Sequence, residues 1–129
     1  VCEGTLIGVD EGLVVKWIIE SAALTNDEIA DLTSLIRDVV IECVGEQKAS
    51  NVFVKTSTGF YKPEDGGPGG ATVGDVSIMS INAGPLKVKA SGGIYSREDL
   101  EKMVDAGASR IGTSAGLEII RGEKAETDY

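Results

Sequence analysis

Short apolar runs alternate with helix-like segments along this chain, and the alternation constrains its fold more than any other feature. Runs rich in β-branched residues, which are typical of buried strands, occupy 13–21, 51–58, 85–93 and 109–116. A segment with helical spacing follows each of the first three runs, and 114–120 has the length of a short helix. Repeated β-α units of this kind predict parallel strands joined by right-handed crossovers.

Hydroxyl residues followed three positions later by an acid mark where the longer helices begin. The side-chain oxygens of such pairs bond to the free N–H groups of a helix's first turn. The pairs are Thr25 with Glu28, Thr72 with Asp75 and Ser96 with Asp99, and the helices that they predict end near 45, 82 and 107.

Every predicted strand ends in a polar or glycine-rich stretch. The stretches are Glu20–Ser21, Thr56–Gly59, Ser91–Gly93 and Gly112–Ser114. The carboxyl ends of parallel strands carry the chemistry in α/β folds, so one edge of the sheet is expected to hold the site. A closed (β/α)8 barrel needs eight strands and about 250 residues. For 129 residues with four expected strands, an open parallel sheet with covered edges is the alternative.

Composition excludes several classes of function. The chain has no histidine, which removes Ser-His-Asp and Cys-His catalysis and imidazole-bound metal. A net charge of −9 argues against a nucleic-acid or anionic-membrane partner, and no apolar run is as long as a membrane span. Cys2 and Cys43 lack metal-ligand spacing, so no metal is expected, and we interpret both as reduced packing residues of a cytosolic protein.

Two strand lysines are the first candidates for chemistry. Lys55 has the parity of Phe53 and Ser57, and Lys89 has the parity of Lys87 and Ser91. On one face of adjacent strands, about 4.8 Å apart, the two ammonium groups would lower each other's pKa. A lysine that loses its proton can attack a carbonyl and form a Schiff base. The alternative is that each lysine extends to solvent from a strand end.

Glycine and hydroxyl residues after the last two strands are candidates for anion binding. The loops Ser91–Gly93 and Gly112–Ser114 leave backbone N–H groups open, and a helix at 114–120 would add a favourable dipole. Ordinary turns are the alternative. The stretch "GGPGG" at 66–70 is interpreted as a flexible loop.

The first strand offers a third polar group. Lys16 and Glu20 share one face of it, where they would line a cavity or form a structural or substrate-orienting pair. Trp17 has the opposite parity and is expected to pack against helices.

Several stretches, in order along the chain, resemble those of deoxyribose-phosphate aldolase: "LVVKWIIES", "FVKTSTGF", "GGATVGDV", "VKASGGI" and "AGASRIGTSAG". Together they cover most of residues 13 to 117, and "KTSTG" followed by "KASGG" is highly specific. The resemblance implies a cytoplasmic class I aldolase of the (β/α)8 TIM-barrel family. It would reversibly split 2-deoxy-D-ribose 5-phosphate into D-glyceraldehyde 3-phosphate and acetaldehyde, with no metal or organic cofactor. Its partners would be a sugar phosphate and an aldehyde.

Carried over by position, the resemblance assigns roles to individual residues. Lys55 corresponds to the Schiff-base lysine, and Lys89 to the second lysine, whose charge lowers the pKa of the first. Tyr129 corresponds to a terminal tyrosine that reaches the active site in some members, within a tail at 121–129 expected to be flexible. The positions at which the family binds the substrate phosphate are Gly59, Gly92, Gly93, Gly112 and Ser114.

The chain departs from the family in what it lacks. It would supply one domain, 1–129, with about four β-α units corresponding to strands five to eight. The family's proton-relay aspartate sits on strand four, and Asp10 lies too early to replace it. The segment 61–70 is longer than usual, and the first residue is Val, as in a trimmed or fragmentary chain.

Three hypotheses follow from these departures. The chain is the C-terminal half of an aldolase that needs its N-terminal half, a homo-oligomer in which two copies pair through open edges, or an aldolase-derived binding module without turnover.

Overall fold

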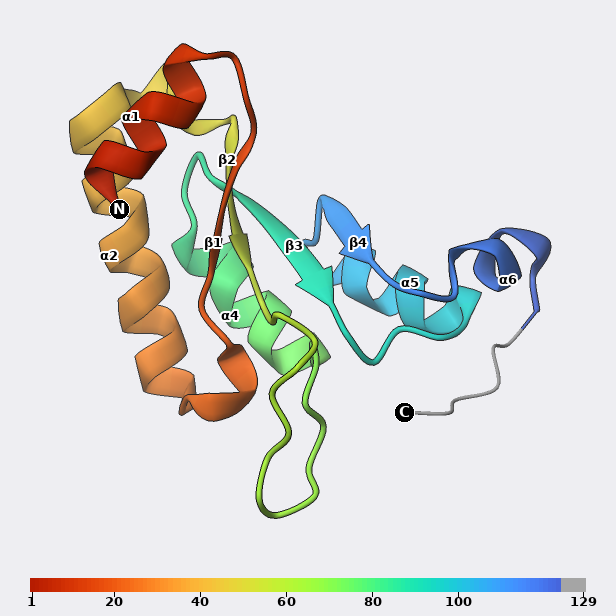
Figure 1. The fold of residues 1–129 in the computed structure, drawn as a ribbon. Coiled ribbons are helices and arrows are strands. Elements are labelled where there is room, and N and C mark those ends of the chain that lie inside the picture. The colour runs from red at the N-terminus through yellow and green to blue at the C-terminus, as the bar shows by residue number, and fades with distance from the viewer. Residues whose placement is uncertain (124–129) are drawn as a thin grey trace.

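The computed structural model describes residues 1–123. Tyr129 and most of the tail expected at 121–129 lie outside the described residues. Figure 1 shows the described chain as a single sheet with helices packed against it. The elements are α1 (Cys2–Asp10), β1 (Val15–Ile18), the 3-10 turn η1 (Ser21–Ala23), α2 (Asn26–Val44), α3 (Glu46–Ala49), β2 (Val52–Lys55), α4 (Val73–Asn82), β3 (Lys87–Ser91), α5 (Arg97–Asp105), β4 (Arg110–Gly112) and α6 (Gly116–Arg121).

The sheet is parallel throughout and has the order β1-β2-β3-β4. This order confirms the alternation expected from the sequence (Figure 1). Each strand is shorter than its apolar run. Backbone hydrogen bonds between neighbours continue past the strand ends, since the Ile19 N–H donates to the Lys55 carbonyl and the Thr56 N–H to the Lys89 carbonyl. Within the described residues, β1 and β4 each have only one neighbouring strand.

The two faces of the sheet are buried to different degrees. Val52, Val54 and Val88 are at most 1% exposed and belong to the core that the helices cover. Side chains of the other parity point to the uncovered face, where Ile18 is 44% exposed. Trp17 lies on the helix side as expected, since its Nε1 donates to Thr5 Oγ1 of α1 at 3.0 Å.

The capping pairs behave as the sequence predicts, with one variation. Thr25 with Glu28, and Ser96 with Asp99, form complete capping boxes at the starts of α2 and α5. Thr72 accepts a hydrogen bond from the Asp75 N–H, but the Asp75 carboxylate accepts from Ser21 Oγ at 2.9 Å. This bond ties the start of α4 to the loop that follows β1.

Cys2 and Cys43 form a disulfide, so the expectation of two reduced thiols was wrong. α1 packs across α2 and brings the two Cα atoms to 5.7 Å across 41 residues of sequence. α1 itself was not expected, since its sequence "CEGTLIGVD" has neither a side-chain cap nor a clear apolar stripe. Arg121, the first residue of the expected tail at 121–129, is the last residue of α6.

None of the helices among residues 1–123 is both long enough and apolar enough to cross a membrane.

Candidate active site

Lys55 and Lys89 are register partners on adjacent strands. Lys55 is the last residue of β2, and its Cα pairs with that of Lys89 in β3. Parallel register partners project from the same face, so the expected neighbourhood of the two amines is confirmed. Both side chains are partly buried, and Lys55 Nζ donates to the Ser57 carbonyl at 2.5 Å. The amine is therefore held at the carboxyl end of its strand.

The surroundings of Lys55 lower the pKa of its amine below the ordinary lysine value. Burial is the largest cause, because removal from water disfavours the charged form. The positive charges of Lys89 and, to a smaller degree, Lys16 act in the same direction. The negative charge of Glu20 raises the pKa and partly offsets them. Lys55 thus gives up its proton at a lower pH than a free lysine.

Glu20 bonds to the loop after β2 and not to Lys16. Its backbone is left-handed, with φ at 55°, which is uncommon for a residue with a side chain. Its carboxylate accepts from the Thr58 N–H at 3.0 and 3.1 Å and from Thr58 Oγ1 at 2.6 Å. Lys16 is exposed in β1 and makes no ion pair within residues 1–123. The expected Lys16–Glu20 pair is therefore wrong.

Replacing Glu20 by Gln is expected to lower the Lys55 pKa further. The amide keeps an oxygen for the Thr58 N–H but removes the negative charge that raises the Lys55 pKa. The lysine then becomes neutral at lower pH, so the midpoint of the pH profile for covalent aldehyde capture moves down. The profile is measured by borohydride trapping across pH. Asp27→Asn, which removes an exposed carboxylate on α2, leaves the midpoint in place. An upward move after Glu20→Gln would contradict the assignment.

The glycines that follow β3 adopt a conformation that side chains disfavour. Gly92 and Gly93 have φ at +83° and +74°. Gly92 also lies against Gly70, because a Cβ on Gly92 would be 2.8 Å from the Gly70 Cα. The Ala71 N–H donates to the carbonyls of Ser91 and Gly92. The end of the stretch at 66–70 is thus docked on the site, which its interpretation as a flexible loop did not anticipate.

The loop after β4 lies beside the loop after β3. Thr113 Oγ1 donates to the Ile94 carbonyl at 2.6 Å and accepts from the Ala115 N–H at 2.9 Å. These bonds hold the β4 loop beside the loop after β3 and leave Ser114 exposed. Gly59, with φ at +94°, is exposed in the loop after β2. Four of the five positions expected at a phosphate site therefore lie in loops after strand ends, and Gly112 is the last residue of β4, so all five lie at one edge of the sheet.

Ser91 belongs to a loop that the sequence indicated for anion binding, but its side chain was not singled out there. Its side chain is 6% exposed, and its Oγ has no hydrogen-bond partner among the described residues. Gly112 leaves room beside it, since a Cβ there would collide with Ser91 Oγ and lie 2.8 Å from Lys89 Cε. The parity that Ser91 shares with Lys89 was the available signal. A free hydroxyl next to Lys89 can bond to a ligand oxygen.

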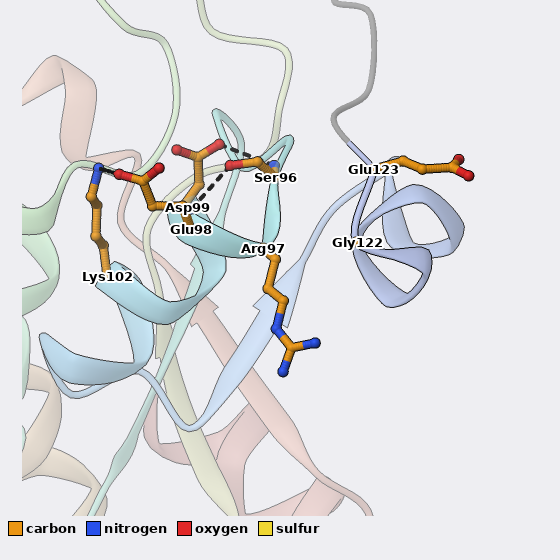
Figure 2. A pocket seen from close by; sticks show the side chains of 7 residues that line it. All are labelled: Ser96, Arg97, Glu98, Asp99, Lys102, Gly122 and Glu123. Carbon is orange, nitrogen blue, oxygen red and sulfur yellow. Dashed lines mark hydrogen bonds and ion pairs between the residues drawn. The ribbon is translucent and has the colours of Figure 1, made fainter.

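Within residues 1–123, a hollow elsewhere on the surface has no buried hydroxyl that is free to bind a ligand. It lies between the start of α5 and the end of α6, as Figure 2 shows. Most of its charged groups are already engaged: Lys102 Nζ contacts Glu98 Oε1 at 2.7 Å, Arg97 Nε contacts Glu101 Oε1 at 3.0 Å, and Asp99 caps α5. Among the described residues, the lysine site holds a buried hydroxyl without a hydrogen-bond partner, that of Ser91, and this hollow holds none. Residues 1–123 contain no cluster of His, Cys, Asp or Glu suited to a metal ion.

Comparisons with known proteins agree with the resemblance seen in the sequence. The chain is 47% identical to deoxyribose-phosphate aldolase of Streptococcus sanguinis over 119 residues, which are 92% of this chain and 47% of that one. A solved structure of a putative deoxyribose-phosphate aldolase from Coccidioides immitis matches with TM-score 0.64 and 39% identity, over 84% of this chain and 38% of its own. A tetrameric deoxyribose phosphate aldolase from Aeropyrum pernix matches with TM-score 0.61 and 31% identity, over 87% and 42%.

The chain spans about half the length of the curated relatives that it matches, and the match falls on their C-terminal half. The four parallel β-α units are therefore part of a (β/α)8 TIM-barrel fold and make up about half of the barrel. No family model matches the chain.

Proposed function

The chain belongs with the C-terminal half of the deoxyribose-phosphate aldolases, and on that premise we propose that it supplies the Schiff-base half of such an enzyme. The reaction is the reversible cleavage of 2-deoxy-D-ribose 5-phosphate to D-glyceraldehyde 3-phosphate and acetaldehyde. The observation that carries the proposal is the register pair of Lys55 and Lys89, with the Lys55 pKa lowered by burial and by the Lys89 charge.

Lys55 is the nucleophile in this proposal. Its neutral amine attacks the C1 aldehyde of the open-chain sugar, and loss of water leaves an iminium. The C3 hydroxyl gives up its proton, the C2–C3 bond breaks, and its electron pair moves into the iminium to form an enamine. Glyceraldehyde 3-phosphate leaves at this point. Protonation of the enamine at C2 and hydrolysis release acetaldehyde and restore the amine. The sequence of steps uses no metal or organic cofactor.

The other residues bind and orient in this proposal. Lys89 keeps the Lys55 pKa low, and Lys16 adds positive charge from the side of β1. The exposed Ser114 and the backbone of the loops at Gly59, Gly92, Gly93 and Gly112 receive the phosphate. Tyr129 lies outside the described residues, and its approach to the site remains part of the proposal.

The proton relay and the remaining strands must come from elsewhere. An N-terminal half would supply both, and it would cover the unpaired edges of β1 and β4. Homo-oligomer formation is the second route to covered edges, and the tetrameric relative supports assembly of some kind. The alternative function is a binding module without turnover, which the missing relay favours. We place the protein in the cytoplasm, although a Cys2–Cys43 disulfide is unusual there.

Covalent trapping tests the proposed function. The protein is incubated with acetaldehyde, reduced with borohydride, digested, and mapped by mass spectrometry. An adduct on Lys55 together with cleavage of deoxyribose 5-phosphate supports the enzyme. An adduct without cleavage supports the half that needs a partner or the binding module. The absence of an adduct on Lys55 would defeat the catalytic proposal.

Ser114→Asp is expected to weaken binding of a sugar phosphate by at least about 10-fold, because a carboxylate beside a phosphate is repelled. Ser114→Ala, which removes only the hydroxyl, is the matched control and weakens binding less. Both affinities are measured by titration calorimetry with deoxyribose 5-phosphate. Equal affinity of the wild type and Ser114→Asp would place the phosphate elsewhere.

A further inference from the structure

The uncovered face of the sheet is strongly basic in a chain whose net charge is −9. Strand register places five of the chain's 12 Lys and Arg residues on it. They are Lys16, Lys55, Lys87, Lys89 and Arg110. None of them takes part in an ion pair within residues 1–123, where the four ion pairs all lie on helices or at their ends. The proposed chemistry uses Lys55 and Lys89 and assigns Lys16 only the effect of its charge on Lys55, so it gives no role to Lys87 and Arg110.

Three of these cations, Lys16, Lys87 and Arg110, lie around Phe53. Arg110 lies over the Phe53 ring at 4.7 Å from Cζ to the ring centre, and Lys87 Nζ is 5.9 Å from the same centre. The ring is 4% exposed, although it lies on the uncovered face of the sheet. The two side chains therefore lie across Phe53, and Lys16 is its register partner on the other side. Lys87 and Arg110 are themselves exposed, so their charged ends are open to a partner.

Closure of a barrel over this face would remove these cations from water, because a barrel interior is filled by side chains. A buried cation without a partner is strongly destabilising, so each one requires an acceptor when the face is covered. Arg110 already stacks on Phe53 by one side of its guanidinium. Its N–H groups suit the two oxygens of a carboxylate. A second copy of this chain would bring five more cations to the same place.

We propose that Lys16, Lys87 and Arg110, arranged around Phe53, are an interface for a complementary β/α half whose inward-facing side chains are carboxylates. The occupant is the N-terminal half of an aldolase barrel and not a second copy of this chain. The inference rests on the proposed function for the identity of the partner and adds the chemistry by which the two halves recognise each other. Lys16 and Lys87 are in register with Phe53, two residues before the level of the lysine pair, whereas Arg110 is the register partner of Lys89 and extends its guanidinium over Phe53.

The test is binding to a supplied half. This chain is co-expressed with the N-terminal half of the Streptococcus sanguinis relative, the part that it does not match. The complex is purified and its dissociation constant measured. The double variant Lys87→Glu/Arg110→Glu is expected to bind at least about 30-fold more weakly, because each reversed charge would face a buried carboxylate. Lys48→Glu/Lys102→Glu, which changes the net charge equally at exposed helix positions, is expected to bind like the wild type.

A neutral variant guards against a folding defect. Lys87→Gln/Arg110→Gln keeps most of each side chain's stem and is expected to bind with intermediate affinity, with an unchanged far-ultraviolet circular dichroism spectrum. Equal weakening by both reversed-charge doubles, or no complex with the wild type, would overturn the proposal. So would self-association of this chain through the face, or co-purified nucleic acid that the Lys87→Glu/Arg110→Glu variant loses.

Aldehyde trapping on the purified complex separates this inference from the proposed function. A complex that depends on Lys87 and Arg110 but forms no Lys55 adduct would support the interface and count against the catalysis. A complex that traps acetaldehyde on Lys55, but whose affinity is unchanged in Lys87→Glu/Arg110→Glu, would support the catalysis and count against the interface.

Discussion

Lys55→Met is expected to abolish the acetaldehyde adduct and all cleavage. Methionine has a similar length and an apolar stem, so the variant removes the amine while filling the same partly buried space at the end of β2. Without an amine no iminium forms, and the reaction loses its electron sink. The expected result is loss of the borohydride-stable mass increase and of turnover to the background rate.

Two controls make this result specific to one nitrogen. Lys48→Met removes an exposed lysine on α3 and leaves the adduct intact. Lys55→Arg keeps a positive charge but not a nucleophile, since guanidinium stays protonated, and it also loses the adduct. An adduct that persists in Lys55→Met and moves to Lys89 would show that the roles of the two lysines are reversed.

Lys89→Met is expected to have the second largest effect, a decrease of cleavage at neutral pH by about 100-fold or more. Removing this positive charge takes away the second of the causes that lower the Lys55 pKa. The Lys55 pKa then rises, so a smaller fraction of the amine is neutral at pH 7 and capture of the aldehyde slows. Because the nucleophile itself remains, capture recovers as the pH is raised through the new pKa.

The pH profile distinguishes this explanation from simple damage to the site. In Lys89→Met the midpoint of aldehyde trapping moves to higher pH, whereas Glu20→Gln moves it to lower pH, since the two groups act on Lys55 with opposite sign. Lys89→Arg keeps the charge and is expected to retain a low midpoint. A Lys89→Met profile with the wild-type midpoint and a uniformly lower rate would mean that Lys89 acts on the substrate and not on the Lys55 pKa.

Much of the fold was predictable because its strands and helices follow from local sequence patterns. Parity along a strand and spacing along a helix depend only on residues near one another in the chain, so the four strands and the starts of α2, α4 and α5 were found from the sequence. α1 was missed because its nine residues carry no cap and hold their place through contacts with α2 and β1.

The candidate site likewise has features that local sequence patterns predict and features that only tertiary contacts create. The two lysines stand out in the sequence because ammonium groups inside apolar strands are costly, and parity placed them on one face. Their pairing in register, the hydrogen bonds that Thr58 donates to Glu20 and the docking of Gly70 on Gly92 depend on loops that meet in space. The Cys2–Cys43 bond was missed for the same reason, because no spacing rule joins residues 41 apart.

The sequence by itself determined the order of the β-α units, the edge of the sheet at which the candidate site lies and the residue types gathered there. These follow from backbone periodicity and side-chain chemistry, which act over a few residues. Only the tertiary structure decided which groups become neighbours, because register and loop packing bring together residues that are distant in the chain. It was the structure that set Glu20 against Lys89 in their effects on Lys55, left Ser91 Oγ without a hydrogen-bond partner among the described residues and gathered five cations on the uncovered face of the sheet.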